Sequence, residues 1–144
     1  MRYWMLAAGA VAAGTVLGFV WPVMADPMPM DTPVDMNGIQ TVCTGVGSAE
    51  DNPEWKAYPI RVEFSNGGAQ YLAGAHITLA QGGKTLADFD CSGSWVLFRL
   101  PGGSYKVTAT LHDQAGTGPR SATFSPPAQG QKRVVIQFPK PPNQ

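Results

Sequence analysis

Apolar and polar residues alternate along most of the chain between residues 58 and 138. In the segment 58–65, Tyr, Ile, Val and Phe occupy every second position, with Pro, Arg, Glu and Ser between them. The segment 105–112 repeats this pattern with Tyr, Val, Ala and Leu. Successive side chains of a β-strand point to opposite faces of its sheet, so a period of two predicts strands with one buried and one exposed face.

Strands of this kind recur along the chain and are separated by turns rich in Gly, Pro, Asn and Ser. Turns at intervals of roughly ten residues favour two packed antiparallel sheets over a parallel sheet with helices. The predicted fold is therefore all-β, a single seven-stranded Greek-key β-sandwich over 58–138. The seven predicted strands cover residues 58–65, 74–80, 84–89, 94–100, 103–112, 119–125 and 132–138.

The N-terminus has the pattern of a secretory signal peptide. Arg2 precedes an apolar run over 3–20, and Ala25 provides the small residue of a cleavage site. We therefore predict a signal peptide over 1–25 and a periplasmic or secreted protein, without a membrane span after cleavage. The alternative is an uncleaved anchor, because 6–24 is almost long enough to cross a bilayer as a helix.

The charge of the exported chain limits its partners. Removal of Arg2 with the signal peptide leaves nine Lys or Arg residues against ten Asp or Glu residues. A net charge near −1 without a basic run argues against nucleic acid or an anionic membrane as a partner.

Both cysteines, Cys43 and Cys91, belong to the exported part. An even pair in an oxidising compartment predicts one disulfide. The alternative is two free, buried thiols. We expect no metal at this pair, because no His or further Cys lies at ligand spacing beside either residue.

The residues before the predicted sandwich divide into two parts. Residues 26–38 are rich in Pro, Asp and Met, and they predict a flexible leader that does not pack. An N-terminal extension follows over 39–57, with a short strand at 39–43 and one or two helical turns over 49–56 that carry Trp55. At the other end, the Pro-rich residues 139–144 predict a disordered tail.

Three stretches carry a resemblance to a known family: Tyr-Leu-Ala-Gly-Ala-His-Ile-Thr-Leu at 71–79, Asp-Cys-Ser-Gly-Ser-Trp-Val-Leu-Phe at 90–98, and Leu-Pro-Gly-Gly-Ser-Tyr-Lys-Val-Thr-Ala at 100–109. Over 58–138 the chain resembles the carboxypeptidase regulatory-like domain family, as an exported bacterial member. The resemblance implies a prealbumin-like (transthyretin-like) β-sandwich that serves as an accessory or interaction module without catalytic residues. The cysteine pair and residues 39–56 are not part of the common pattern.

The residues able to perform chemistry are few, and we predict neither catalysis, nor a metal site, nor a cofactor. His76 and His112 have the outward parity of their strands, so we expect solvated side chains. No nucleophile and base are found in a context that would pair them.

The predicted strand over 94–100 has an unusual outward face. Trp95, Leu97 and Arg99 share the outward parity, and an exposed Trp beside a Leu is uncommon on a solvated face. In one interpretation, the 39–57 extension is held by the disulfide and covers Trp95 together with Trp55. In the other, Trp55, Trp95 and Arg99 form a binding platform for a sugar ring or a peptide.

These observations predict an exported, non-catalytic β-sandwich that acts as an interaction or assembly module, with a protein partner in the cell envelope. The alternative is a carbohydrate-binding module that uses exposed Trp residues to hold a polysaccharide. A third hypothesis, a hydrolase, has no recognisable site in the sequence.

Overall fold

The computed structural model describes residues 14, 27–66, 72–112 and 118–139. Apart from Gly14, the predicted signal peptide lies outside the described residues, and so does the predicted tail from residue 140 onward. Among the helices in these ranges, none has the length and apolar character needed to cross a membrane.

The described chain is all-β, with two short 3-10 helices before the third strand. The helices are η1 (Gly47–Asp51) and η2 (Pro53–Ala57). The strands are β1 (Val34–Met36), β2 (Ile39–Thr44), β3 (Ile60–Ser65), β4 (Ala75–Gln81), β5 (Lys84–Cys91), β6 (Trp95–Arg99), β7 (Tyr105–Leu111), β8 (Arg120–Phe124) and β9 (Lys132–Gln137). The predicted count of seven strands is wrong. The seven strands of the predicted sandwich correspond to β3 through β9, and the short strand predicted at 39–43 corresponds to β2. β1 is additional.

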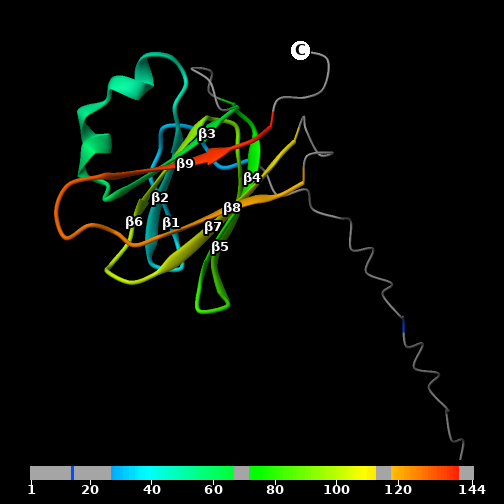
Figure 1. Ribbon diagram of the computed structural model, residues 1–144. Coiled ribbons are helices and arrows are strands. Elements are labelled where there is room, and N and C mark those ends of the chain that lie inside the picture. The colour runs from blue at the N-terminus through cyan, green and yellow to red at the C-terminus, as the bar shows by residue number, and fades with distance from the viewer. Residues whose placement is uncertain (1–13, 15–26, 67–71, 113–117, 140–144) are drawn as a thin grey trace, which may run out of the picture.

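The strands form two sheets (Figure 1). Sheet A has the order β1-β2-β6-β3-β9, and sheet B has the order β5-β4-β7-β8. Neighbours are antiparallel, except that β3 and β9 run parallel. The inner faces of the two sheets meet: Phe89 of β5 and Phe98 of β6 lie edge to face, with ring centroids 6.2 Å apart. The result is a two-layered, sandwich-like fold.

The apolar positions of the alternating pattern fill the space between the sheets. The inward positions of β3, β4, β6 and β7 are almost completely buried, and each large apolar side chain contributes about 1.5–3 kcal/mol of burial free energy. Tyr105 is inward, as predicted; its hydroxyl donates to the Pro101 carbonyl at 3.0 Å, and its ring stacks on Phe124. Tyr58 is an exception, because β3 begins only at Ile60 and Tyr58 packs on the outside of sheet A.

Residues 28–36 pack against the sandwich, so the prediction of a leader that does not pack is wrong for them. Met28 is buried in the core, and its N–H donates to the Asp90 carbonyl at 2.9 Å. β1 pairs with β2, and the Asn37 amide donates to the Leu86 carbonyl at 2.7 Å. The physical reason is the free edge of β5. The unpaired backbone carbonyls of this edge strand need hydrogen-bond donors. The composition of residues 26–38 gives no information about an edge strand so far along the chain.

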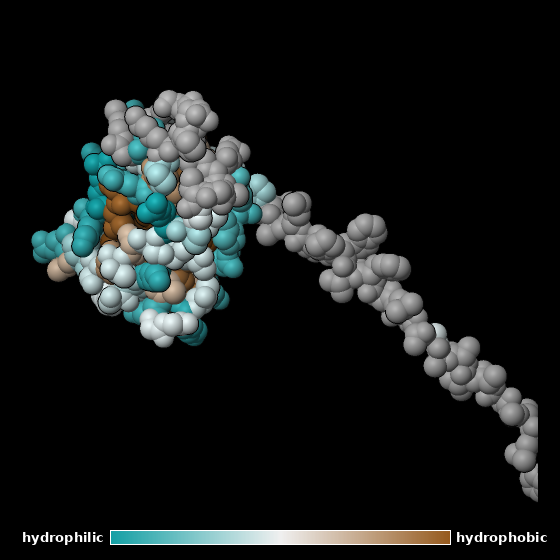
Figure 2. All heavy atoms as spheres, turned by 45° about the vertical axis from the view of Figure 1, so that its right-hand side comes forward, coloured by the Kyte–Doolittle hydropathy of each residue, from teal (hydrophilic) through white to brown (hydrophobic). Residues whose placement is uncertain are grey.

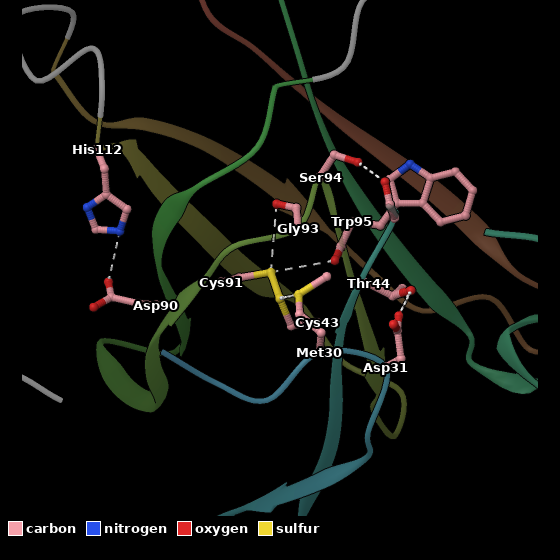
Figure 3. The surroundings of a disulfide bond; sticks show 11 residues. Met30, Asp31, Cys43, Thr44, Asp90, Cys91, Gly93, Ser94, Trp95 and His112 are labelled. Carbon is pink, nitrogen blue, oxygen red and sulfur yellow. Dashed lines mark hydrogen bonds and ion pairs between the residues drawn. A yellow bond between two sulfur atoms is a disulfide. The ribbon is translucent and has the colours of Figure 1, made fainter. Parts of the chain in front are cut away.

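The predicted disulfide is confirmed. Cys43 on β2 and Cys91 on β5 are bonded, with Cα atoms 5.6 Å apart, so the bond joins sheet A to sheet B (Figure 3). The Met30 sulfur lies 3.4 Å from the Cys43 sulfur. Closing a loop of 48 residues stabilises the fold by about 4 kcal/mol in the chain-entropy model.

Candidate functional site

The segment 45–58 crosses the outer face of sheet A. In Figure 1 it arches out beside β3 and β9, on the side remote from β4 and β5. Trp55 and Tyr58 form a buried cluster with Val42 of β2 and Leu97 of β6. The exposed fraction is only 4% for Trp55 and 7% for Trp95. The covering interpretation of Trp95 therefore agrees with the structure, and the two indoles do not form an exposed platform.

Local hydrogen bonds hold Trp55 in place. Asn52 caps η2, because its side-chain oxygen accepts from the Glu54 N–H at 3.0 Å, and Pro53 begins the helix. The Trp55 indole N–H donates to the Ala49 carbonyl at 2.8 Å. The Gln131 amide donates to the Trp55 carbonyl, also at 2.8 Å. The predicted helical turns over 49–56 are confirmed as two 3-10 helices.

A buried carboxylate lies beside Trp95 on the same face. Glu63 of β3 is completely buried, although its strand position is outward. Arg61 Nε lies 3.0 Å from one carboxylate oxygen, and Arg133 Nε donates to the other. The Arg61 guanidinium also stacks on Trp95, with its Cζ 4.5 Å from the ring centroid. Pairing with two arginines is what allows a carboxylate to remain charged without water.

Arg99 is on the same face but is separated from the two indoles. Its Nε donates to the Gln40 side chain at 3.1 Å, and its Cζ lies 4.9 Å from the centroid of the Tyr58 ring. It borders a different hollow, next to Pro127. The structure therefore brings Trp55 and Trp95 together and leaves Arg99 apart from them.

Trp55 and Trp95 share one pocket between the 3-10 helices and sheet A, which we call the Trp–Arg pocket. Its volume is about 280 Å³. The lining includes two carboxylates, two cationic groups and two side-chain amides in addition to the indoles. The lining residues are Glu50, Asp51, Asn52, Trp55, Lys56, Arg61, Trp95 and Gln131.

Sequence reasoning missed Arg61 and Glu63 as parts of a site. The alternating pattern presents both as polar, outward residues of an amphipathic strand. The sequence predicts Glu63 and Trp95 as outward residues of two strands, but it does not predict that these strands are neighbours with the two residues opposite each other. A charged residue that lies across from a buried indole is itself drawn out of water, so it needs a partner of opposite charge.

The two histidines lie on the outer face of sheet B and contact carboxylates. His76 Nδ1 is 2.7 Å from Asp90, and His76 Nε2 is 2.5 Å from Asp88. His112 Nε2 is 3.3 Å from Asp90 (Figure 3). Partial burial lowers the pKa of His76, but the hydrogen bond to Asp90 and the charges of both carboxylates outweigh it. The pKa is therefore raised above its usual 6.5.

This cluster is an arrangement of ion pairs. Both ring nitrogens of His76 are directed at carboxylates. Within the described ranges, no three side chains of the His, Cys, Asp or Glu type are placed to hold a metal ion. The expectation that both histidines are outward agrees with their exposure, but His76 is paired rather than simply solvated.

Comparison with known proteins gives no family assignment. No protein-family model matches this sequence. A search of the curated proteins also found no match. Membership of the carboxypeptidase regulatory-like family therefore stays a prediction that rests on the sequence resemblance.

Proposed function

We propose that this protein is an exported, non-catalytic β-sandwich that acts in the cell envelope as a binding module, with the Trp–Arg pocket as its recognition site. The pocket is the observation that carries the proposal. Its lining comes from η1 and η2, β3, β6 and the residue before β9, which are far apart in the sequence. Small-ligand sites combine aromatic side chains with converging polar groups; this pocket has both, with more polar groups than most such sites.

The disulfide supports export. Bonds of this kind persist in the periplasm and outside the cell and are rare in the cytosol, where thiols are kept reduced. The bond between Cys43 and Cys91 is buried and spans both sheets, so its role is structural. This agrees with the predicted signal peptide over 1–25.

The sandwich and its turn chemistry support an accessory module of the prealbumin-like kind. The strands β3 to β9 follow the order of the resemblance, and the Leu100 to Tyr105 element forms the turn between β6 and β7. Folds of this kind carry many unrelated functions, so the activity must be argued from the pocket.

The surroundings of His76 support a non-catalytic role for this side chain. A general base needs one ring nitrogen free to take a proton from the substrate. Both nitrogens of His76 are bound to aspartates.

A carbohydrate-binding module is the second candidate, because both indoles border the same pocket. A sugar ring stacks on an open aromatic face. One face of Trp95 is occupied by Arg61, and Trp55 is almost completely buried. Sugar stacking therefore requires Arg61 to move away from Trp95.

Site-specific photocrosslinking tests the proposed function. A benzophenone amino acid replaces Asp51, which is exposed and lines the pocket. The matched control carries it at Glu54, which is exposed in the neighbouring helix and does not line the pocket. After irradiation of cells, intact-mass spectrometry should find an adduct at position 51 and none at position 54. Absence of any adduct at 51, or equal adducts at both positions, would contradict the proposal.

A further inference from the structure

We infer that the Trp–Arg pocket binds a small zwitterion of amino-acid size, with its carboxylate on Arg61 and its ammonium group on Glu50. The inference rests on the proposed function and specifies the ligand of that same site. Three properties of the pocket carry it: a guanidinium held in one orientation, a lining with balanced charges, and a small volume.

Two contacts position the Arg61 guanidinium in the absence of a ligand. Its Nε lies 3.0 Å from the buried Glu63 carboxylate, and its Cζ lies over the Trp95 ring, 4.5 Å from the ring centroid. The side chain still has 28% of its surface exposed and borders the pocket. No residue of the described ranges accepts a hydrogen bond from its two terminal nitrogens. Such a planar, preorganised fork matches the two oxygens of a carboxylate.

The charges around the pocket are balanced and unpaired with one another. Glu50 and Asp51 contribute two negative charges, and Lys56 and Arg61 contribute two positive charges. Within the described chain, neither Glu50, nor Asp51, nor Lys56 forms an ion pair. A ligand with a net charge would meet one repulsive pair of these groups. A zwitterion matches both pairs at once, which is the charge complementarity that gives specificity.

The volume of the pocket limits the size of the ligand. About 280 Å³ is at or below the lower end of the range for drug-sized ligands, so a molecule of a few heavy atoms fits best. A neutral sugar would offer no counterpart to the four charged groups that it desolvates.

Calorimetric titration and Trp fluorescence of the full-length exported protein test the inference. The probes are glycine, L-alanine, L-lysine, L-glutamate and L-phenylalanine, each compared with its amide and its N-acetyl derivative. Glycine, L-alanine or L-phenylalanine should bind, and L-lysine and L-glutamate, which carry a net charge, should bind more weakly. Removal of either charge of the bound amino acid should weaken its binding by about ten-fold or more. Binding of an amide or an N-acetyl derivative as tight as that of the free amino acid would overturn the inference.

Two variants locate the binding in this pocket. Arg61→Gln should weaken binding by about ten-fold or more, whereas Arg99→Gln should leave it unchanged, although Arg99 also stacks on an aromatic ring of this face. Glu50→Gln removes a charge that pairs with no described residue and should also weaken binding, with an unchanged dichroism spectrum. Equal affinities of wild type and both pocket variants would overturn the inference.

Different results would contradict this inference and the proposed function. If no amino acid binds at about 10 mM while the adduct at position 51 forms, the pocket is a binding site for another class of ligand. Binding of a monosaccharide without any amino acid also overturns the inference and favours the carbohydrate-binding candidate. If the adduct is also absent, both proposals fail.

Discussion

The outer faces of the two sheets differ, although their strands alternate with the same period. On sheet A, the outward side chains include Val42, Trp95 and Leu97, and the segment 45–58 covers them. On sheet B, the outward side chains are small or charged and no described segment covers them. They include His76, Thr78, Asp88, Asp90, Lys106, Thr108, Ser121 and Thr123.

Figure 2 brings forward the right-hand side of the view in Figure 1, and the surface seen there is mostly white and teal, with smaller brown areas. Period alone therefore does not decide whether a face meets water. The identity of the outward residues decides it, because a Thr or Asp is stable in water and a Trp beside a Leu needs cover. The same cover creates the Trp–Arg pocket, so the candidate site belongs to the covered face.

Truncation of Trp55, the largest buried side chain of the segment 45–58, should have the largest effect on stability. Trp55→Ala leaves a cavity above Leu97 and Val42, and we expect the free energy of unfolding to fall by about 4 kcal/mol. The matched change on sheet B, Thr78→Ala, should alter it by at most about 0.5 kcal/mol. Urea denaturation measures both. Similar losses of unfolding free energy for the two variants would mean that Trp55 contributes no more to stability than an exposed residue of sheet B.

Substitutions of two glycines test the close packing at the start of the segment 45–58. Gly45 has φ +96°, and an added Cβ would lie 2.6 Å from Ser94 Oγ and 2.8 Å from the Trp95 backbone nitrogen. Gly45→Ala should therefore cost about 3 kcal/mol of unfolding free energy. Gly83, in the turn between β4 and β5, has φ +81° with open space around it, so Gly83→Ala should cost about 1 kcal/mol. Thermal unfolding ranks the two variants, and a smaller loss for Gly45→Ala would refute the close contact with β6.

Buried and exposed carboxylates provide the third comparison. Glu63→Gln leaves Arg61 and Arg133 without their shared counter-ion. Since both arginines keep some contact with water, we expect a loss of about 2 kcal/mol. Asp88→Asn on sheet B removes an exposed ion pair to His76 and should cost at most about 0.5 kcal/mol. Chemical denaturation at neutral pH distinguishes them; an equal loss would indicate that water reaches Glu63.

The smallest effect is a pH dependence confined to sheet B. The raised pKa of His76 means that the folded state holds its proton more tightly than the unfolded chain. The contribution is therefore fully present below about pH 6.5 and is lost as the pH rises through the folded-state pKa. Because the cluster is exposed, the gain is well under about 1 kcal/mol.

Titration of His76 by NMR should give a pKa above 6.5. The His76→Gln variant should lose more stability relative to wild type at about pH 5.5 than at about pH 8.5. His112 shares Asp90 with His76, so His112→Gln provides the control and should raise the pKa of His76 further. A His76 pKa at or below 6.5 would show that the two aspartates do not hold the ring.

The alternation of residue types by itself determined the seven strands from β3 to β9, the inward set around Phe98 and Tyr105, and the outward parity of Trp95 and Leu97. Capping residues indicated the helical turns that carry Trp55. The disulfide was expected on other grounds, from the count of two cysteines and the predicted compartment. These features follow from local rules, since strand parity and turn chemistry act over a few residues. The resemblance added an expectation about the fold that no comparison has tested.

Only the tertiary structure decided that residues 28–36 pack, that Glu63 is buried, and that Trp55 and Trp95 share a pocket while Arg99 lies apart. Each of these depends on groups distant in sequence: the free edge of β5, the two arginines, and the segment 45–58 over sheet A. A strand's sequence specifies which side of the sheet each residue faces. Whether another segment then removes that side from water is settled by the packing of the whole chain, because burial is a property of the neighbours and not of the residue.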